Sequence, residues 1–227
     1  MMIDSYYLVL VAPALLLSML AQFKVRSTFA KYSRIPCSRP ITGKDAAQFL
    51  MRASHITGVA AEPVRGSLTD HYDPAAKTLR LSQPVYNRNS IAAVGVAAHE
   101  TGHAIQHARG YGPLVLRSAL VPIANIGSSA GPWLAIAGIF LSFPLLVKLG
   151  IMLFGGAVLF YLITLPVEFD ASARAIAILR GSRILTEDEL RGVKRVLTAA
   201  AMTYVASALT ALMSFLRLIL IARNRDR

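Results

Sequence analysis

The chain has 227 residues, of which 55% are hydrophobic and only 16% are charged. This composition is too apolar for an ordinary soluble domain, and it predicts a membrane protein with one small soluble portion. The formal net charge of +12 comes from basic residues that flank apolar runs without interleaved stacking aromatics. We therefore expect a lipid bilayer with anionic headgroups as the partner and exclude nucleic acid. The single cysteine, Cys37, excludes an internal disulfide and a cysteine-based metal site.

The first predicted element is a transmembrane anchor in residues 1–23. Ser5 to Phe23 carries no charge and is close to the roughly 20 residues that cross the hydrocarbon of a bilayer. No basic segment precedes it, so it does not read as a signal peptide and we expect it to stay uncleaved. Basic residues follow at once, which predicts that this end lies in the cytoplasm: Lys24, Arg26, Lys31, Arg34 and Arg39.

Residues 24–117 are predicted to form the first part of a soluble domain. Thr42 and Asp45 have the spacing of a capping box and predict the start of a helix. Further on, apolar and polar residues alternate, which predicts a strand that ends before Pro84. The residues of this strand are Thr78, Leu79, Arg80, Leu81 and Ser82. We expect it to be an edge strand, to which an extended peptide can add as a further strand.

His99, Glu100 and His103 form an HEXXH motif in an apolar segment that runs to Arg109 and Gly110. On a helix, residues four apart share one face, so two imidazoles can bind one ion. Two histidines and one further protein ligand are typical of catalytic zinc sites, which leave a position open for water. Zinc lowers the pKa of that water, and Glu100 can then act as its general base. The apolar flanks argue against two merely solvated histidines.

The third ligand is less evident. His107 shares the helix face of His103. One straight helix cannot easily direct side chains from three successive turns at one ion, so we predict that His107 contacts the ligands rather than the metal. Glu168 and Asp170 directly follow a long apolar run and are predicted to open an Ala-rich helix. An acid in this position is costly unless it is paired or metal-bound. We predict Glu168 as the third ligand; the alternative is that both acids only favour a helix N-terminus.

Residues 118–167 contain a single charge, Lys148, and predict a two-span transmembrane hairpin. Two crossings return the chain to its original side, so residues 168–196 can complete the catalytic domain. Residues 197–227 are predicted to form a transmembrane or membrane-associated helix with a basic tail. Within it, Tyr204 is a candidate donor to an oxyanion, although a packing role is the simpler interpretation.

The segment from His99 to His107, together with residues 165–172, resembles the YugP-type membrane zinc metallopeptidases, and more distantly the HtpX-like and CAAX prenyl proteases. The resemblance implies that His99, His103 and Glu168 bind zinc and that Glu100 is catalytic. The wider group carries an aspartate four residues after the ligand glutamate, where this chain has Ser172. Asp170 is the candidate replacement, but it projects from a different helix face.

The sequence thus predicts a mostly α fold with a small β element, in which several membrane spans carry a minimal, gluzincin-like HEXXH domain. The expected function is zinc-dependent cleavage of membrane or membrane-proximal proteins. The expected location is a bacterial-type plasma membrane, with the site facing the cytoplasm, in a homo-oligomer or a membrane-protein complex. Two alternatives remain. One is a site-2-type intramembrane protease with Asp170 as ligand; the other is a non-catalytic, zinc-stabilised scaffold.

Overall fold

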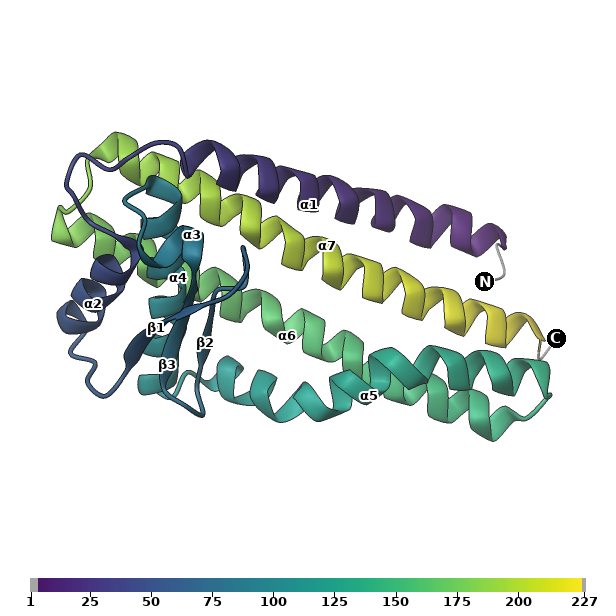
Figure 1. Cartoon of the computed structure of the whole chain (residues 1–227). Helices are drawn as coiled ribbons and strands as arrows, with labels where there is room; N and C mark the ends of the chain where they lie inside the picture. Colours follow the sequence, from purple (N-terminus) through teal and green to yellow (C-terminus); the bar gives the residue numbers. More distant parts are fainter. Residues whose placement is uncertain (1–3, 226–227) are drawn as a thin grey trace. The chain divides into compact units, whose positions relative to one another are not determined.

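A computed structural model describes residues 4–225 of the chain. It is mostly helical, and its elements in chain order are η1 (Tyr7–Val11), α1 (Ala12–Tyr32), α2 (Gly43–Ala53), β1 (Ala60–Val64), β2 (His71–Asp73), β3 (Thr78–Ser82), α3 (Gln83–Tyr86), α4 (Ile91–Ala108), α5 (Gly112–Phe140), α6 (Pro144–Ser182) and α7 (Glu187–Arg225) (Figure 1). They form two compact units. The mixed unit comprises Phe23–Leu114 and Val167–Ala201, and the helical unit comprises residues 4–22, Val115–Pro166 and residues 202–225.

The sheet of the mixed unit has the strand order β1-β3-β2. The strand predicted at Thr78–Ser82 is present as β3, but the prediction that it is an edge strand is wrong. It pairs along its whole length with β1 in parallel and, through Thr78 to Arg80, with β2 antiparallel. Both sides of β3 are therefore occupied, and the outer strands of this sheet are β1 and β2. Pro84 marks the first turn of α3 rather than a sheet edge.

The core of the mixed unit lies between this sheet and helices α2, α3 and α4. Leu79 and Leu81 of β3 are fully buried and belong to the same apolar cluster as Leu50 of α2, Val85 of α3 and Val94 of α4. Burying these side chains contributes about 1.5–3 kcal/mol for each of them. The alternate leucines of β3 thus supply one face of this core.

Two capping boxes set the starts of helices in the mixed unit, and the first of them, at Thr42, confirms the prediction. The Thr42 hydroxyl accepts a hydrogen bond from the Asp45 amide, and the Asp45 carboxylate accepts one from the Thr42 amide. At α7, Thr186 and Glu189 make the same reciprocal pair. Glu189 also accepts a hydrogen bond from the Ser38 amide, at 2.5 Å, so this cap ties the start of α7 to the segment after α1.

Four helices are long and apolar enough to cross a membrane: Tyr7–Tyr32, Gly112–Phe140, Pro144–Ser182 and Glu187–Asn224. Within the helical unit, α5 and α6 form a hairpin whose backbones approach closely. A Cβ atom on Gly127 would lie only 2.1 Å from the Leu153 carbonyl oxygen. Where the sequence predicts a two-span hairpin, the structure thus has two helices that are long and apolar enough to cross a membrane, joined by a short turn at residues 141–143.

The prediction that Glu168 and Asp170 open a new helix is wrong. Both lie in the interior of α6, which continues through Pro166 without a break. A proline inside a helix is tolerated where its neighbours repack around it. The alternative interpretation, in which the two acids only favour a helix N-terminus, therefore fails as well.

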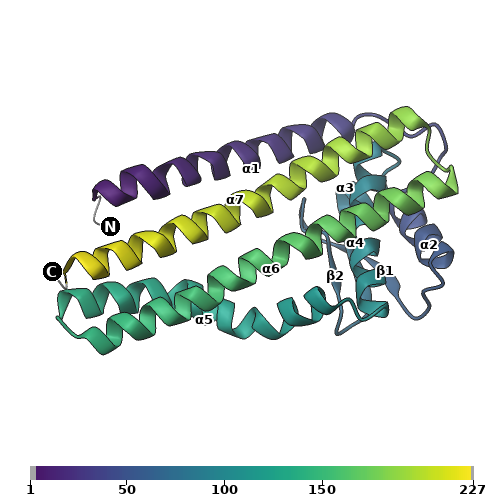
Figure 2. The same cartoon turned by 180° about the vertical axis from the view of Figure 1, so that it is seen from behind.

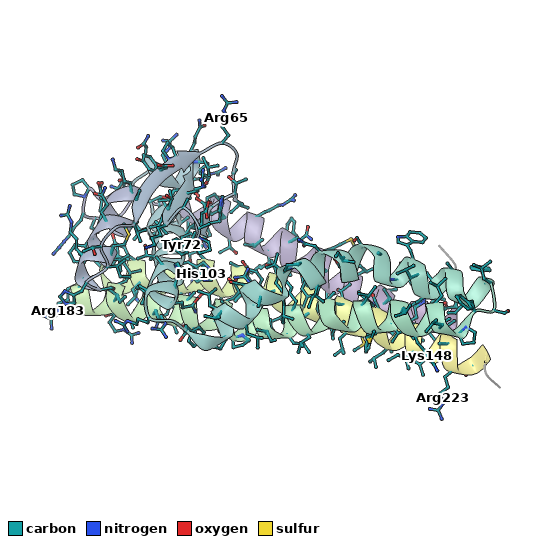
Figure 3. All side chains as sticks on the ribbon, turned by 90° about the horizontal axis from the view of Figure 1, so that it is seen from below. Arg65, Tyr72, His103, Lys148, Arg183 and Arg223 are labelled. Atoms are coloured by element: carbon teal, nitrogen blue, oxygen red, sulfur yellow. The ribbon has the colours of Figure 1, made fainter. Side chains whose placement is uncertain are left out.

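An ion pair in the helical unit joins Asp4, just before η1, to Arg217 of α7. Arg217, the charge that interrupts the apolar run of α7, donates to both carboxylate oxygens of Asp4, with a shortest distance of 2.6 Å. These hydrogen bonds hold the pKa of Asp4 below its ordinary value. The end of α7 and the α5–α6 turn lie at one end of this unit (Figure 2), where Figure 3 also labels Lys148 and Arg223. This arrangement fits four helices that all run the length of the unit.

Candidate metal centre

Helix α4 supplies two histidines to one site. The Ser90 side chain caps its first turn by accepting a hydrogen bond from the Ala93 amide. The helix then buries an apolar face and ends at Ala108. Arg109 is its C-terminal cap, and Gly110 follows with a φ of +60°. His99 and His103 stand one turn apart, with their ring centroids 4.8 Å from each other and their planes at 83°. Both rings can thus turn one nitrogen toward a common point.

Glu168 of α6 faces these two rings. Its Oε2 atom lies 3.2 Å from Nε2 of His99 and 3.5 Å from Nε2 of His103. Candidate ligand atoms of all three residues fall within 4.8 Å of one another. The glutamate is only 2% exposed, and a buried carboxylate requires a compensating positive charge. The structure therefore brings together the three residues that the sequence singled out.

The charge balance of this cluster attracts a cation. Burial lowers the pKa of His103, but the hydrogen bond with Glu168 and the charges of Glu100 and Glu168 raise it by more, so the net direction is upward. Glu100 is itself buried, with 8% of its surface exposed, and it follows His99 directly on α4. Two acids and two imidazoles in one buried place are typical of a site that holds a metal.

A close contact between helices sets the spacing of these groups. Gly102 of α4 packs on the backbone of α6, and a Cβ atom there would lie 2.4 Å from the Ala171 carbonyl oxygen. Only glycine allows this approach, which keeps α4 and α6 near enough for Glu168 to reach both histidines. Because the nearest atoms belong to the α6 backbone, a Cβ at this position could be accommodated only by moving one of the two helices.

We expect Gly102→Ala to lower the free energy of unfolding by about 1–3 kcal/mol through overpacking. Thermal unfolding of the purified protein in detergent measures this change. Gly112→Ala is the matched control, since a Cβ at Gly112 meets nothing within 4 Å. Equal unfolding temperatures for the two variants would show that the α4–α6 contact relaxes freely.

The outer nitrogen of each histidine also has a partner. Nδ1 of His99 lies 3.0 Å from the Ser172 hydroxyl of α6. Nδ1 of His103 lies 3.0 Å from the side-chain oxygen of Gln106. Ser172, four residues after Glu168, thus contacts His99 directly. Gln106 was not predicted, although an uncharged amide three residues after a histidine on a buried helix face could have indicated it.

Asp170 and His107, the candidate neighbours of the ligands, contact other residues. Asp170 accepts hydrogen bonds from Gln106 at 2.8 Å and from Arg174 at 2.5 Å, so it is linked to His103 only through Gln106. Nδ1 of His107 lies 2.8 Å from the hydroxyl of Tyr72 on β2, and both side chains are exposed or half-buried (Figure 3 labels Tyr72 and His103). This contact connects the end of α4 to an outer strand.

Tyr204, the oxyanion candidate, lies on α7 in the part that belongs to the helical unit. Its proposed role stays a prediction.

Comparison with known proteins agrees with this geometry. A protein family described as "Putative neutral zinc metallopeptidase" matches residues 7–223. The chain is 48% identical over 218 residues to the "Putative membrane protease YugP" of Bacillus subtilis (strain 168), which covers 96% of this chain and 97% of that protein. No solved structure matches the chain. On the strength of a match that spans almost every residue, the chain belongs to the family that carries this description.

Proposed function

We propose that the protein is a membrane-embedded zinc metalloendopeptidase that hydrolyses peptide bonds of membrane or membrane-proximal proteins. The observation that carries this proposal is the convergence of His99, His103 and Glu168 beside Glu100. The family and the relative named above support the same class of reaction. The four apolar helices support attachment to a membrane.

The donor set fits zinc. Two imidazole nitrogens and one carboxylate oxygen form the three-ligand set of many catalytic zinc sites, which leave one position for water or substrate. The partners at Nδ1 of each histidine leave Nε2 to face the metal. Cys37 does not compete for this role, because burial raises the pKa of its thiol to about 12 and keeps it protonated.

Glu100 is the catalytic base and acid of the proposed reaction. When bound, zinc would lower the pKa of a water molecule toward neutrality and polarise the scissile carbonyl. Glu100 takes a proton from the attacking water while the water oxygen bonds to the carbonyl carbon. It then delivers this proton to the leaving nitrogen as the C–N bond breaks. One water is consumed for each bond, and the carboxylate returns to its charged form.

The strand that would bind an extended substrate is β2 rather than β3. It is an outer strand of the sheet, it packs against α4, and its Tyr72 reaches His107 near the end of that helix. A substrate that adds to β2 in an extended form would lie along the helix that carries His99 and His103. Its backbone would supply affinity independent of side-chain identity.

The site-2-type alternative loses its metal ligand. Asp170 is already bound by Arg174 and Gln106, whereas Glu168 lies within reach of both histidines. The scaffold alternative requires no base, yet Glu100 is buried beside the cluster. The two hypotheses make different predictions for replacement of Glu100. Substrates should accumulate if the protein is a protease, and none should accumulate if it is a scaffold.

Comparative proteomics of membranes tests the function directly. Cells that contain the Glu100→Gln protein should accumulate intact substrates, and cells that contain the wild-type protein should yield their cleavage products. Identical proteomes, with both proteins folded and zinc-loaded, would favour the scaffold.

The proposed site faces the cytoplasm, because residues 24–117 contain more than half of the 24 Lys and Arg residues of the chain. A labelling experiment in the Cys37→Ala background tests this orientation. We expect an impermeant maleimide to label Leu141→Cys, in the α5–α6 turn, on intact cells. Arg65→Cys, in the exposed β1–β2 loop, should react only after permeabilisation. The opposite pattern would place the site on the outer side.

A further inference from the structure

We infer that Gln106 is a positioning residue, which fixes the tautomer and the ring orientation of His103 and links this ring to Asp170. The inference rests on the proposed zinc site, since it concerns how one of its histidines is held. Gln106 is fully buried on α4, three residues after His103. Its side chain makes three hydrogen bonds, to partners on both α4 and α6.

The orientation of the Gln106 amide is dictated by its surroundings. Its nitrogen lies 2.7 Å from the Val167 carbonyl oxygen and 2.8 Å from Oδ2 of Asp170. Both of these atoms only accept hydrogen bonds, so the NH₂ group must face them. The amide oxygen is left to face Nδ1 of His103, at 3.0 Å.

The protonation of His103 follows from this orientation. An amide oxygen can only accept, so Nδ1 of His103 must carry the hydrogen. In a neutral imidazole the lone pair then sits on Nε2, the nitrogen that faces Glu168. The other tautomer would place a hydrogen where a metal must bind. His99 has no equivalent constraint, because the Ser172 hydroxyl beside its Nδ1 can either donate or accept.

A second set of contacts keeps Gln106 and Asp170 in place. The Arg174 guanidinium binds Asp170 and lies 5.5 Å from the ring centroid of Tyr111. The amide of Tyr111 in turn donates a hydrogen bond to the backbone carbonyl of Gln106, at 2.9 Å. The acceptor that orients the amide is thus held by the segment that follows α4. Outer partners of this kind typically change metal affinity by about 10–100-fold.

Zinc affinity of the full-length protein in detergent tests the inference. Metal-free protein is titrated with Zn²⁺ in competition with a chromophoric chelator. We expect Gln106→Met, which keeps the volume but loses the hydrogen bonds, to bind Zn²⁺ about 10–100-fold more weakly than wild type. Thr101→Val is the matched control, a buried polar-to-apolar change on α4 whose hydroxyl bonds only the Ala97 carbonyl. It should leave the affinity unchanged.

A charge exchange gives a second readout that survives if Gln106→Met fails to fold. Gln106→Glu directs a second carboxylate at Asp170 and should also weaken Zn²⁺ binding. Adding Asp170→Asn to the same chain provides an amide that can donate to the new carboxylate at position 106. This double variant should recover part of the Zn²⁺ affinity. A role in folding alone would lower the unfolding temperature without this rescue.

The outcomes are distinct. Equal Zn²⁺ affinity of wild type, Gln106→Met and Gln106→Glu would overturn the role of Gln106 and leave the zinc site intact. Absence of Zn²⁺ binding by the wild-type protein would overturn the proposed function and the inference with it.

Discussion

The Glu100→Gln protein is expected to retain about one zinc per chain while peptide hydrolysis falls by about 10²–10⁴-fold, the usual contribution of a general acid–base group. The amide has nearly the shape of the carboxylate but cannot take a proton from water. Because Glu100 is not among the three residues grouped around the candidate metal position, the metal should stay. Steady-state kinetics on a substrate found by proteomics, together with metal analysis, measure both effects.

The control for this prediction is Glu187→Gln, which makes the same chemical change at an exposed position in the first turn of α7. It should keep wild-type turnover and zinc content. Hydrolysis by Glu100→Gln within tenfold of the wild-type rate would remove Glu100 from the mechanism. Loss of zinc from this variant would instead make Glu100 part of the metal's surroundings.

The second large effect is expected for Glu168→Gln, whose consequence should depend on the metal. Glu168 is buried, and without a metal its charge is compensated by its contacts with two imidazoles. Removing that charge breaks these contacts and should lower the unfolding temperature in chelator. With zinc the difference between wild type and variant should grow. At a zinc concentration 100 times its dissociation constant the wild type gains about 2.7 kcal/mol, and the variant should lose most of this gain.

Unfolding curves test whether Glu168 is the third ligand. They are recorded in chelator and in zinc, for wild type and both glutamate variants. Glu100→Gln is the matched control, since it removes another buried carboxylate near His103 but should keep the zinc-dependent shift. If Glu168→Gln shows the full shift, the third ligand is another residue. His107, whose ring now pairs with Tyr72, would be the first to test.

The parts of the fold that depend on local chemistry could be predicted from the sequence. The Thr42 and Thr186 capping boxes form because their partners lie three residues away. Helix α4 ends at Ala108, two residues before Gly110, whose positive φ suits the end of a helix. The grouping of Glu168 with two histidines 65 and 69 positions earlier could be anticipated only because the motif requires a third ligand.

Other features depend on partners that the sequence does not identify. The alternation in Thr78–Ser82 predicts a strand but says nothing about what lies on each side, and β2, with three residues, is too short to predict. The end of the apolar run before Glu168 suggested the start of a new helix, whereas α6 continues through Pro166. The role of Gln106 depends on Val167 and Asp170, which only the folded chain brings next to it.

The separation of α4 from the middle of α6 also has a consequence for biosynthesis. His103 and Glu168 are 65 positions apart, with all of α5 between them. At the usual speed of translation, the ribosome adds the intervening residues in about 3–13 s. During that interval the nascent chain holds two imidazoles and no buried carboxylate to complete the centre. The proposed centre is therefore completed only after α5 and the first part of α6 have been synthesised.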